Sequence, residues 1–169
     1  MKRVLSAVIC FLMVLTMMPF LFGTAQAAPS ASEVPFENAA VVSETCEELG
    51  DGYYLRVITY TDAAVPCADR YTKTVGRTYI VSNDYDEDLF SLTIRGTFLI
   101  EYAAYSVCTG VSYDYEIYNT DWYLSSAETS KSDYHAFCTA VFKLKVLGIV
   151  IETKTIDAQV SCNAFGVVS

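Results

Sequence analysis

Apolar and polar side chains alternate along most of the chain after residue 40, which is the pattern of β-strands with one buried face. The segment Leu89–Tyr102 shows the alternation most clearly. Its even-numbered positions predict one apolar face: Phe90, Leu92, Ile94, Phe98, Ile100 and Tyr102. Gly96 falls on the same face, and a glycine there predicts a bulge or the close approach of another segment.

Three further segments alternate in the same way. In Asp69–Ser82 the apolar side is Tyr71, Val75, Tyr79 and Val81, opposite Thr72, Thr74 and Thr78. In His135–Val146 it is Ala136, Cys138, Ala140, Phe142, Leu144 and Val146, and in Thr153–Cys162 it is Ile156, Ala158, Val160 and Cys162. Each is predicted to be a strand that faces a core.

A hairpin is predicted at the start of this region, where Val41–Leu49 and Tyr53–Thr61 flank Gly50-Asp51-Gly52. The alternative is a short helix over Glu37–Leu49 that ends at Gly50. The hairpin is preferred because the segment lacks an apolar face of helical period.

The remaining strands are expected over Tyr105–Tyr118 and Trp122–Thr129. Turns are expected at Asn83–Asp88, Asn119–Asp121 and Ser130–Asp133, with a bend at Gly148. Short strands at this spacing predict an all-β fold over residues 41–169, a single antiparallel β-sandwich of about 7–8 strands, immunoglobulin-like in architecture.

A different pattern comes before the strands. Lys2 and Arg3 precede an apolar run from Val4 to Phe22, and Ala25-Gln26-Ala27 follows as a cleavage site. Residues 1–27 are therefore predicted to be a cleaved signal peptide, which implies a secreted, extracellular protein. The alternative is an uncleaved membrane anchor, since the run is near the roughly 20 residues that a spanning helix needs. Residues 28–40 are expected to be a flexible leader.

Cleavage makes the chain more acidic. Loss of Lys2 and Arg3 changes the formal net charge from −9 to −11. Because an acidic surface repels phosphate backbones and anionic lipid, nucleic acid is not expected as a partner, nor is a membrane after cleavage. A protein or glycan ligand remains possible, and no cofactor is expected.

The secreted chain keeps five cysteines, and outside the cytosol such residues are expected to pair. The sequence leaves the connectivity open. Cys108–Cys162, which would join a middle strand to the last one, is preferred, and Cys46–Cys67 would close the first hairpin. Cys138 is then left over, either as a buried thiol or as the link of a disulfide-bonded dimer.

The acidic turn is the candidate metal site. Asp84, Asp86 and Asp88 offer the oxygen ligands that calcium prefers, although the segment departs from the EF-hand pattern at Leu89 and Arg95. The alternative is a solvated hairpin turn.

Tyrosines supply the candidate binding residues. Tyr105, Tyr113 and Tyr115 are expected on one face of a strand and Tyr123 on the next, where flat rings could stack on sugars. The alternative is that these tyrosines only make cross-strand pairs. Trp122 is expected to anchor the core.

No catalytic residues are predicted. His135 is the only histidine, and its odd separation from Cys138 would place the two side chains on opposite faces of a strand. His135 is therefore expected at the surface or at an edge, and the sequence has no recognised nucleophile or phosphate-binding pattern.

Several short segments resemble a group of small secreted proteins of Gram-positive, chiefly clostridial, bacteria. These segments are Asp51-Gly52-Tyr53-Tyr54, Arg95-Gly96-Thr97-Phe98, Cys108, Trp122, Ser125–Ala136, Leu147-Gly148-Ile149-Val150 and Ser161-Cys162-Asn163. The resemblance implies a signal peptide, an all-β domain and a bridge between Cys108 and Cys162, but no activity. Cys46, Cys67 and Cys138 lie outside the pattern, and Leu99–Ala103 replaces its aromatic-Asp-Gly turn.

The sequence thus favours a secreted, non-enzymatic β-sandwich that binds a ligand or has a structural role at or near the cell envelope. The alternatives are a secreted hydrolase of unrecognised type and an adhesin-like or toxin-like interaction protein.

Overall fold

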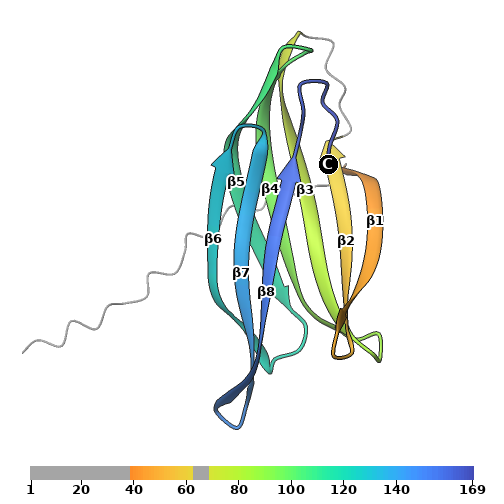
Figure 1. Ribbon diagram of the computed structural model, residues 1–169, viewed down its shortest axis with the longest axis vertical. Coiled ribbons are helices and arrows are strands. Elements are labelled where there is room, and N and C mark those ends of the chain that lie inside the picture. Colours follow the sequence, from red (N-terminus) through yellow and green to blue (C-terminus); the bar gives the residue numbers. More distant parts are fainter. Residues whose placement is uncertain (1–38, 63–68) are drawn as a thin grey trace, which may run out of the picture. The chain divides into compact units, whose positions relative to one another are not determined.

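The computed structural model describes residues 39–62 and 69–169, which form eight antiparallel strands in two packed sheets (Figure 1). The larger sheet has the order β1-β2-β3-β4-β5 and the smaller one β6-β7-β8, so every sheet neighbour is also a chain neighbour. The strands are β1 (Ala39–Gly50), β2 (Tyr53–Asp62), β3 (Arg70–Asn83), β4 (Asp88–Glu101), β5 (Tyr105–Ile117), β6 (Trp122–Ser132), β7 (His135–Val146) and β8 (Ile149–Ser161). The predicted all-β, two-sheet sandwich is confirmed.

The core lies between the two sheets and is built from the alternating faces that the sequence predicts. The central strand β4 contributes the most fully buried side chains: Phe90, Leu92, Ile94, Phe98 and Ile100. From the smaller sheet they meet Ala136, Cys138, Ala140, Phe142, Ile156, Ala158 and Val160. Tyr102 is exposed instead, because β4 ends at Glu101 and a turn begins.

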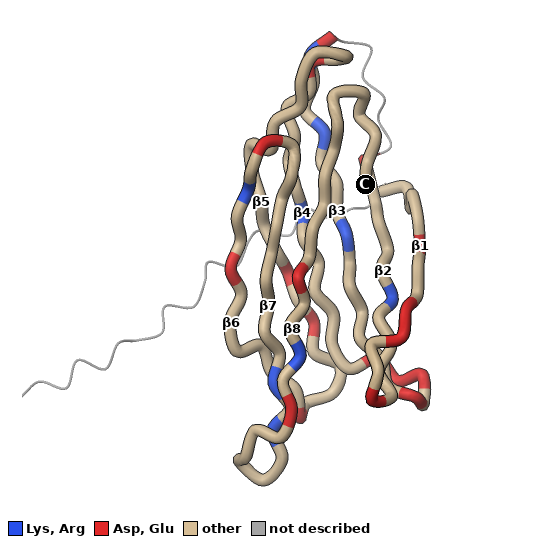
Figure 2. The backbone as a smooth tube through the Cα atoms, viewed as in Figure 1, with Lys and Arg blue, Asp and Glu red and all other residues tan. Residues whose placement is uncertain are grey.

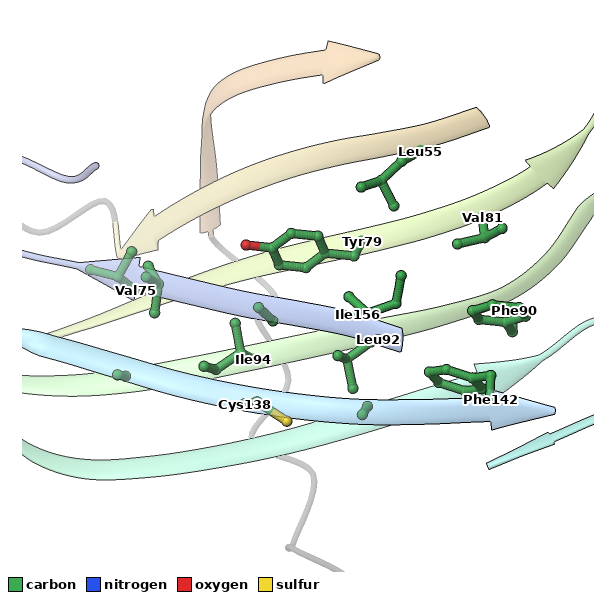
Figure 3. Packing of buried hydrophobic residues seen from close by; sticks show 14 of the residues in the cluster. Leu55, Val75, Tyr79, Val81, Phe90, Leu92, Ile94, Cys138, Phe142 and Ile156 are labelled. Carbon is green, nitrogen blue, oxygen red and sulfur yellow. The ribbon is translucent and has the colours of Figure 1, made fainter. Parts of the chain in front are cut away.

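Stacked aromatic rings join the two layers near one end of the core. The ring of Phe90 lies 4.1 Å from that of Phe142, measured between centroids (Figure 3). The centroid of the Trp122 ring lies 5.0 Å from that of Phe90. Trp122 is almost fully buried, as expected. Burial of each such ring contributes about 1.5–3 kcal/mol, so this cluster holds the sheets together.

Gly96 lies where the two layers approach each other closely. A Cβ atom at this position would lie 2.6 Å from the Phe98 ring and 3.1 Å from the Cβ of Ala136 on β7. The close approach that the sequence predicts at this glycine is therefore confirmed.

The first hairpin is also confirmed, and no helix forms there. Gly50, Asp51 and Gly52 all have positive φ angles, of 80°, 53° and 78°, which turn the chain from β1 into β2. Strand β1 begins at Ala39, two residues inside the predicted leader. Its side chains are exposed on both faces, because β1 extends the larger sheet at its edge.

Two predicted boundaries differ from the structure. Strand β6 continues to Ser132, so the turn expected at Ser130–Asp133 is confined to Asp133 and Tyr134. Strand β8 begins at Ile149, four residues before the predicted Thr153. The predicted signal peptide, and most of the predicted leader, lie outside the described residues. Within the described part, no helix is long and apolar enough to cross a membrane.

Candidate binding surface

The four candidate tyrosines do not form one surface. In the register of β5 with β4, Thr97 pairs with Gly110 but Phe98 pairs with Cys108, so Thr109 is an inserted bulge residue. The bulge reverses the alternation between the two halves of β5. Tyr113 and Tyr115 lie on the same face as the core residues of β4, whereas Tyr105 lies on the opposite face, contrary to the expectation that all three share one.

Tyr123 lies on β6 in the smaller sheet, whereas the other three tyrosines lie on β5 in the larger sheet. It pairs with Lys143 on β7, one position away from the pair that Trp122 makes with Leu144. Because Trp122 faces the core, Tyr123 faces outward from the smaller sheet. The structure therefore brings Tyr113 and Tyr115 together and places Tyr105 and Tyr123 on two other faces.

The acidic turn between β3 and β4 is organised by hydrogen bonds of its own. The side-chain oxygen of Asn83 accepts bonds from the amides of Tyr85 (3.0 Å) and Glu87 (3.1 Å). The Asp88 carboxylate accepts bonds from the Ser82 hydroxyl (2.7 Å) and the Arg56 guanidinium (3.3 Å). Across residues 39–62 and 69–169, no three acidic, histidine or cysteine side chains are grouped to hold a metal ion. Asp84, Asp86 and Asp88 are thus not grouped with one another in this structure, and calcium binding by the turn stays a prediction.

A hollow of about 540 Å³ lies beside this turn, at the end of the sandwich where β4 begins and β5 ends. It is lined by Glu87, Asp88, Leu89, Tyr118, Asn119, Thr120 and Asp121. The hydroxyl of Tyr118 donates to Glu116 at 2.9 Å. The hydrogen bond with Ser91 lowers the pKa of Tyr118, but burial and the Glu116 carboxylate together outweigh it and raise that pKa above its usual value.

The cysteines that the sequence singles out are free thiols where the structure describes them. The backbone amides of Cys108 and Cys162 both bond the β6–β7 turn, at Asp133 and Tyr134. Their sulfur atoms contact the carbonyls of Gly110 and Asn163, so the expected Cys108–Cys162 bridge is not formed in this structure. Burial raises the pKa of both thiols.

Cys138 and Cys46 have opposite environments. Cys138 lies in the core with 1 % of its surface exposed, and burial raises its pKa to about 11. It is therefore a buried thiol in the folded chain, which is the first of the two alternatives that the sequence leaves open. Cys46 is exposed on β1, and its expected partner Cys67 lies outside the described residues.

His135 lies on the outer side of β7, opposite the core face that carries Cys138, as its sequence separation predicts. Its Nδ1 is hydrogen-bonded to the side-chain amide of Gln159 at 2.9 Å, and its ring packs against Tyr134, with centroids 4.2 Å apart. His135 is thus held at the surface and is not placed beside a nucleophilic sulfur.

The turn between β7 and β8, where the sequence predicts a bend at Gly148, carries an exposed apolar tip. Five aliphatic side chains within six residues are exposed there, and they form what we call the hairpin tip: Val146, Leu147, Ile149, Val150 and Ile151. Leu147 is 97 % exposed, Ile149 67 % and Ile151 60 %. In Figure 1 this hairpin projects beyond the other turns at the same end of the sandwich.

The conformation of the tip is unusual for its sequence. Leu147 and Gly148 have φ angles of 51° and 86°, so two successive residues are left-handed, as in a tight two-residue hairpin turn. Glycine adopts this conformation freely, but a bulky side chain does so at a cost of about 1–2 kcal/mol. Asn and Asp are the usual non-glycine residues at such positions, and Asp51, Asp86 and Asp133 occupy other left-handed positions in this fold.

Basic side chains stand directly behind the tip. Lys143 and Lys145 lie on β7 and Lys154 on β8, whereas residues 146–151 carry no charge (Figure 2). Glu152 is the nearest acidic residue on β8, and it pairs with Lys154 at 3.0 Å and accepts a bond from the Tyr53 hydroxyl at 2.5 Å. The hairpin therefore presents an uncharged tip above a stem with an excess of positive charge.

A comparison of the chain with protein-family models, with curated proteins and with solved structures found no match in any of the three.

Proposed function

We propose that this chain is a secreted, non-enzymatic binding protein that acts at or near the cell envelope. Its β-sandwich is immunoglobulin-like in its two packed sheets, although its sheet order is that of consecutive hairpins. The hairpin tip is the binding element of this proposal. The signal peptide predicted over residues 1–27 supports the extracellular location.

The observation that carries the proposal is the exposure of the hairpin tip. A large apolar side chain that stays in water lacks the roughly 1.5–3 kcal/mol of stabilisation that its burial would contribute. A contiguous apolar surface on a soluble domain typically marks an interaction site. Here the five residues fall within six positions at the end of a projecting hairpin, and they are separate from the core that stabilises the fold. Binding explains their position, whereas folding does not.

The test uses the secreted form of the chain, collected from the medium of an expressing Gram-positive host. N-terminal sequencing is expected to begin at Ala28. This protein is then mixed with washed cell envelopes, and the bound fraction is compared between the wild type and Leu147→Asn. Binding that depends on Leu147 supports the proposal, whereas equal retention of both proteins, or retention of neither, overturns it.

A further inference from the structure

We propose that the hairpin tip inserts into the interfacial region of a phospholipid bilayer, with Lys143 and Lys145 at the phosphate groups. This inference rests on the proposed binding function and names its partner. The net negative charge of the chain predicts that no membrane is bound. The present proposal differs, because the charges closest to the lipid would be those beside the tip.

The register of the hairpin shows that the tip is apolar on both faces. Val146 pairs with Ile149, and Lys145 pairs with Val150 one rung further from the turn. Successive rungs point to opposite faces of the hairpin, so Ile149 and Val150 face opposite sides. A flat protein surface would cover only one of these sides. Immersion in lipid covers both sides at once, together with Leu147 at the apex.

The apex is built from a residue that the fold does not require. Leu147 is almost completely exposed, and it adopts a left-handed conformation that Asn or Asp would adopt at lower cost. Its side chain therefore contributes neither packing nor turn geometry. Contact with the hydrocarbon of a bilayer would bury the Leu147 side chain, which explains why an aliphatic residue stands at the apex.

The spacing between the apex and Lys145 matches the depth to which apolar groups enter the lipid interface. A strand rises about 3.3 Å per residue, so the apex at Leu147 lies about 7 Å beyond Lys145. Apolar groups of interfacial proteins are buried about 5–10 Å into the boundary between headgroups and acyl chains. With the tip at that depth, the ammonium groups of Lys143 and Lys145 reach the phosphates.

The overall negative charge of the chain does not prevent this contact. At physiological ionic strength the Debye length is about 8 Å, so charges further from the lipid are largely screened. Within that range the hairpin carries Lys143 and Lys145, while Glu152 is paired with Lys154. Asp121 lies close to the stem, since its carbonyl accepts a bond from the Lys145 amide at 2.9 Å. The acidic turns that join β1 to β2 and β3 to β4 lie at the same end of the sandwich, but the hairpin projects beyond them, so Lys145, one residue from the tip, lies nearer the lipid (Figure 2).

Vesicle sedimentation tests the proposal directly. The secreted protein is mixed with vesicles of phosphatidylcholine and phosphatidylglycerol in a 7:3 ratio, and the bound fraction is measured for the wild type, Leu147→Asn and Val41→Asn. We expect Leu147→Asn to lower the partition coefficient at least roughly tenfold, since one large aliphatic side chain is lost from the lipid. Its Tm should be equal or higher, because Asn suits the left-handed turn.

Val41→Asn is the matched control. Val41 is also a large, exposed aliphatic residue, but it lies on β1, outside the hairpin. Its replacement should leave vesicle binding unchanged. Equal binding by Leu147→Asn and the wild type, or an equal loss in both variants, overturns the proposal.

A fluorescence measurement tests insertion independently of affinity. In Leu147→Trp the new indole should shift its emission to shorter wavelength on addition of vesicles, and brominated lipid should quench it. Trp122 is 3 % exposed and should contribute no such change. Unchanged emission in the presence of bound vesicles overturns insertion.

Two results separate failure of the lipid proposal from failure of the proposed function. If vesicles do not bind but delipidated cell wall retains the wild type and not Leu147→Asn, the binding function holds and lipid is the wrong partner. If neither material shows dependence on Leu147, both proposals fail. A wild-type dimer that Leu147→Asn converts to monomer, without vesicle binding, would identify a second copy as the occupant and overturn the lipid proposal.

Discussion

The hydroxyl of Tyr79 on β3 bonds both backbone groups of Gln159 on β8. It donates to the carbonyl oxygen at 3.1 Å and accepts from the amide at 3.0 Å. Arg77 donates to the same carbonyl at 2.8 Å. Strand β8 forms the edge of the smaller sheet, so these side chains of the opposite sheet bond backbone groups that a neighbouring strand would otherwise pair.

Replacement of Tyr79 by Phe is expected to lower the free energy of unfolding by about 1–2 kcal/mol, because the Gln159 amide loses its partner while the ring remains buried. Urea denaturation measures the difference. Tyr85→Phe is the control, since Tyr85 is 83 % exposed in a turn, and it should change stability by less than about 0.5 kcal/mol. Equal stabilities of Tyr79→Phe and the wild type would show that the bonds to Gln159 contribute nothing.

Gly96→Ala is expected to destabilise the fold by about 1–3 kcal/mol, because the new methyl group would overlap the Phe98 ring. Gly110→Ala provides a matched control on the neighbouring strand. The nearest atom to a Cβ at position 110 is 3.7 Å away, in Thr97, which is an ordinary contact. Thermal unfolding of both variants checks the difference, and equal Tm values would contradict the close approach of the sheets at Gly96.

The thiols are expected to differ in reactivity under native conditions. With its pKa raised to about 11, Cys138 has roughly one thiolate in a thousand molecules at pH 8, and its sulfur is buried. Iodoacetamide should therefore modify the exposed Cys46 and leave Cys138 unmodified until the protein is denatured. Peptide mass mapping identifies the labelled residues. Labelling of Cys138 at the rate of Cys46 would contradict its place in the core.

Tyr53 is expected to make stability depend on alkaline pH. Burial and the hydrogen bond to Glu152 raise its pKa from 10.0 to about 12, so the native state holds this proton more tightly than the unfolded state. The resulting stabilisation is present below pH 10 and is lost as the pH rises toward about 12. Tyr53→Phe should therefore be less stable than the wild type at neutral pH, and the difference should shrink between pH 10 and 12. A difference that is independent of pH would contradict the assignment.

The core was predictable because period-2 alternation survives wherever one face of a strand is buried. Phe90 through Ile100 on β4 and Ile156 through Val160 on β8 show this directly. Alternation could not predict the end of β6, because residues 128–132 are exposed on both faces. Their polar side chains are also typical of a turn. The start of β8 was predicted too late for the opposite reason. Residues 149–151 are apolar on both faces, so they show no alternation.

The candidate site depended on two features that alternation does not reveal. The inserted Thr109 in β5 moved Tyr105 to the face opposite Tyr113, and nothing in the spacing of the tyrosines indicates a bulge. The hairpin tip did leave a signal, which is an aliphatic run on both sides of Gly148, bounded by Lys145 and Glu152. Such a run is also typical of a buried strand, so exposure had to come from the structure.

Strand β1 has a further consequence for the kinetics of the native state. Because it is attached along one edge to β2 and buries almost none of its own surface, it can detach without opening the core. Its amide protons should exchange with solvent deuterium well before those of β4, at a free energy below that of global unfolding. In its absence β2 becomes the edge, and the domain that remains has seven strands around an intact interior.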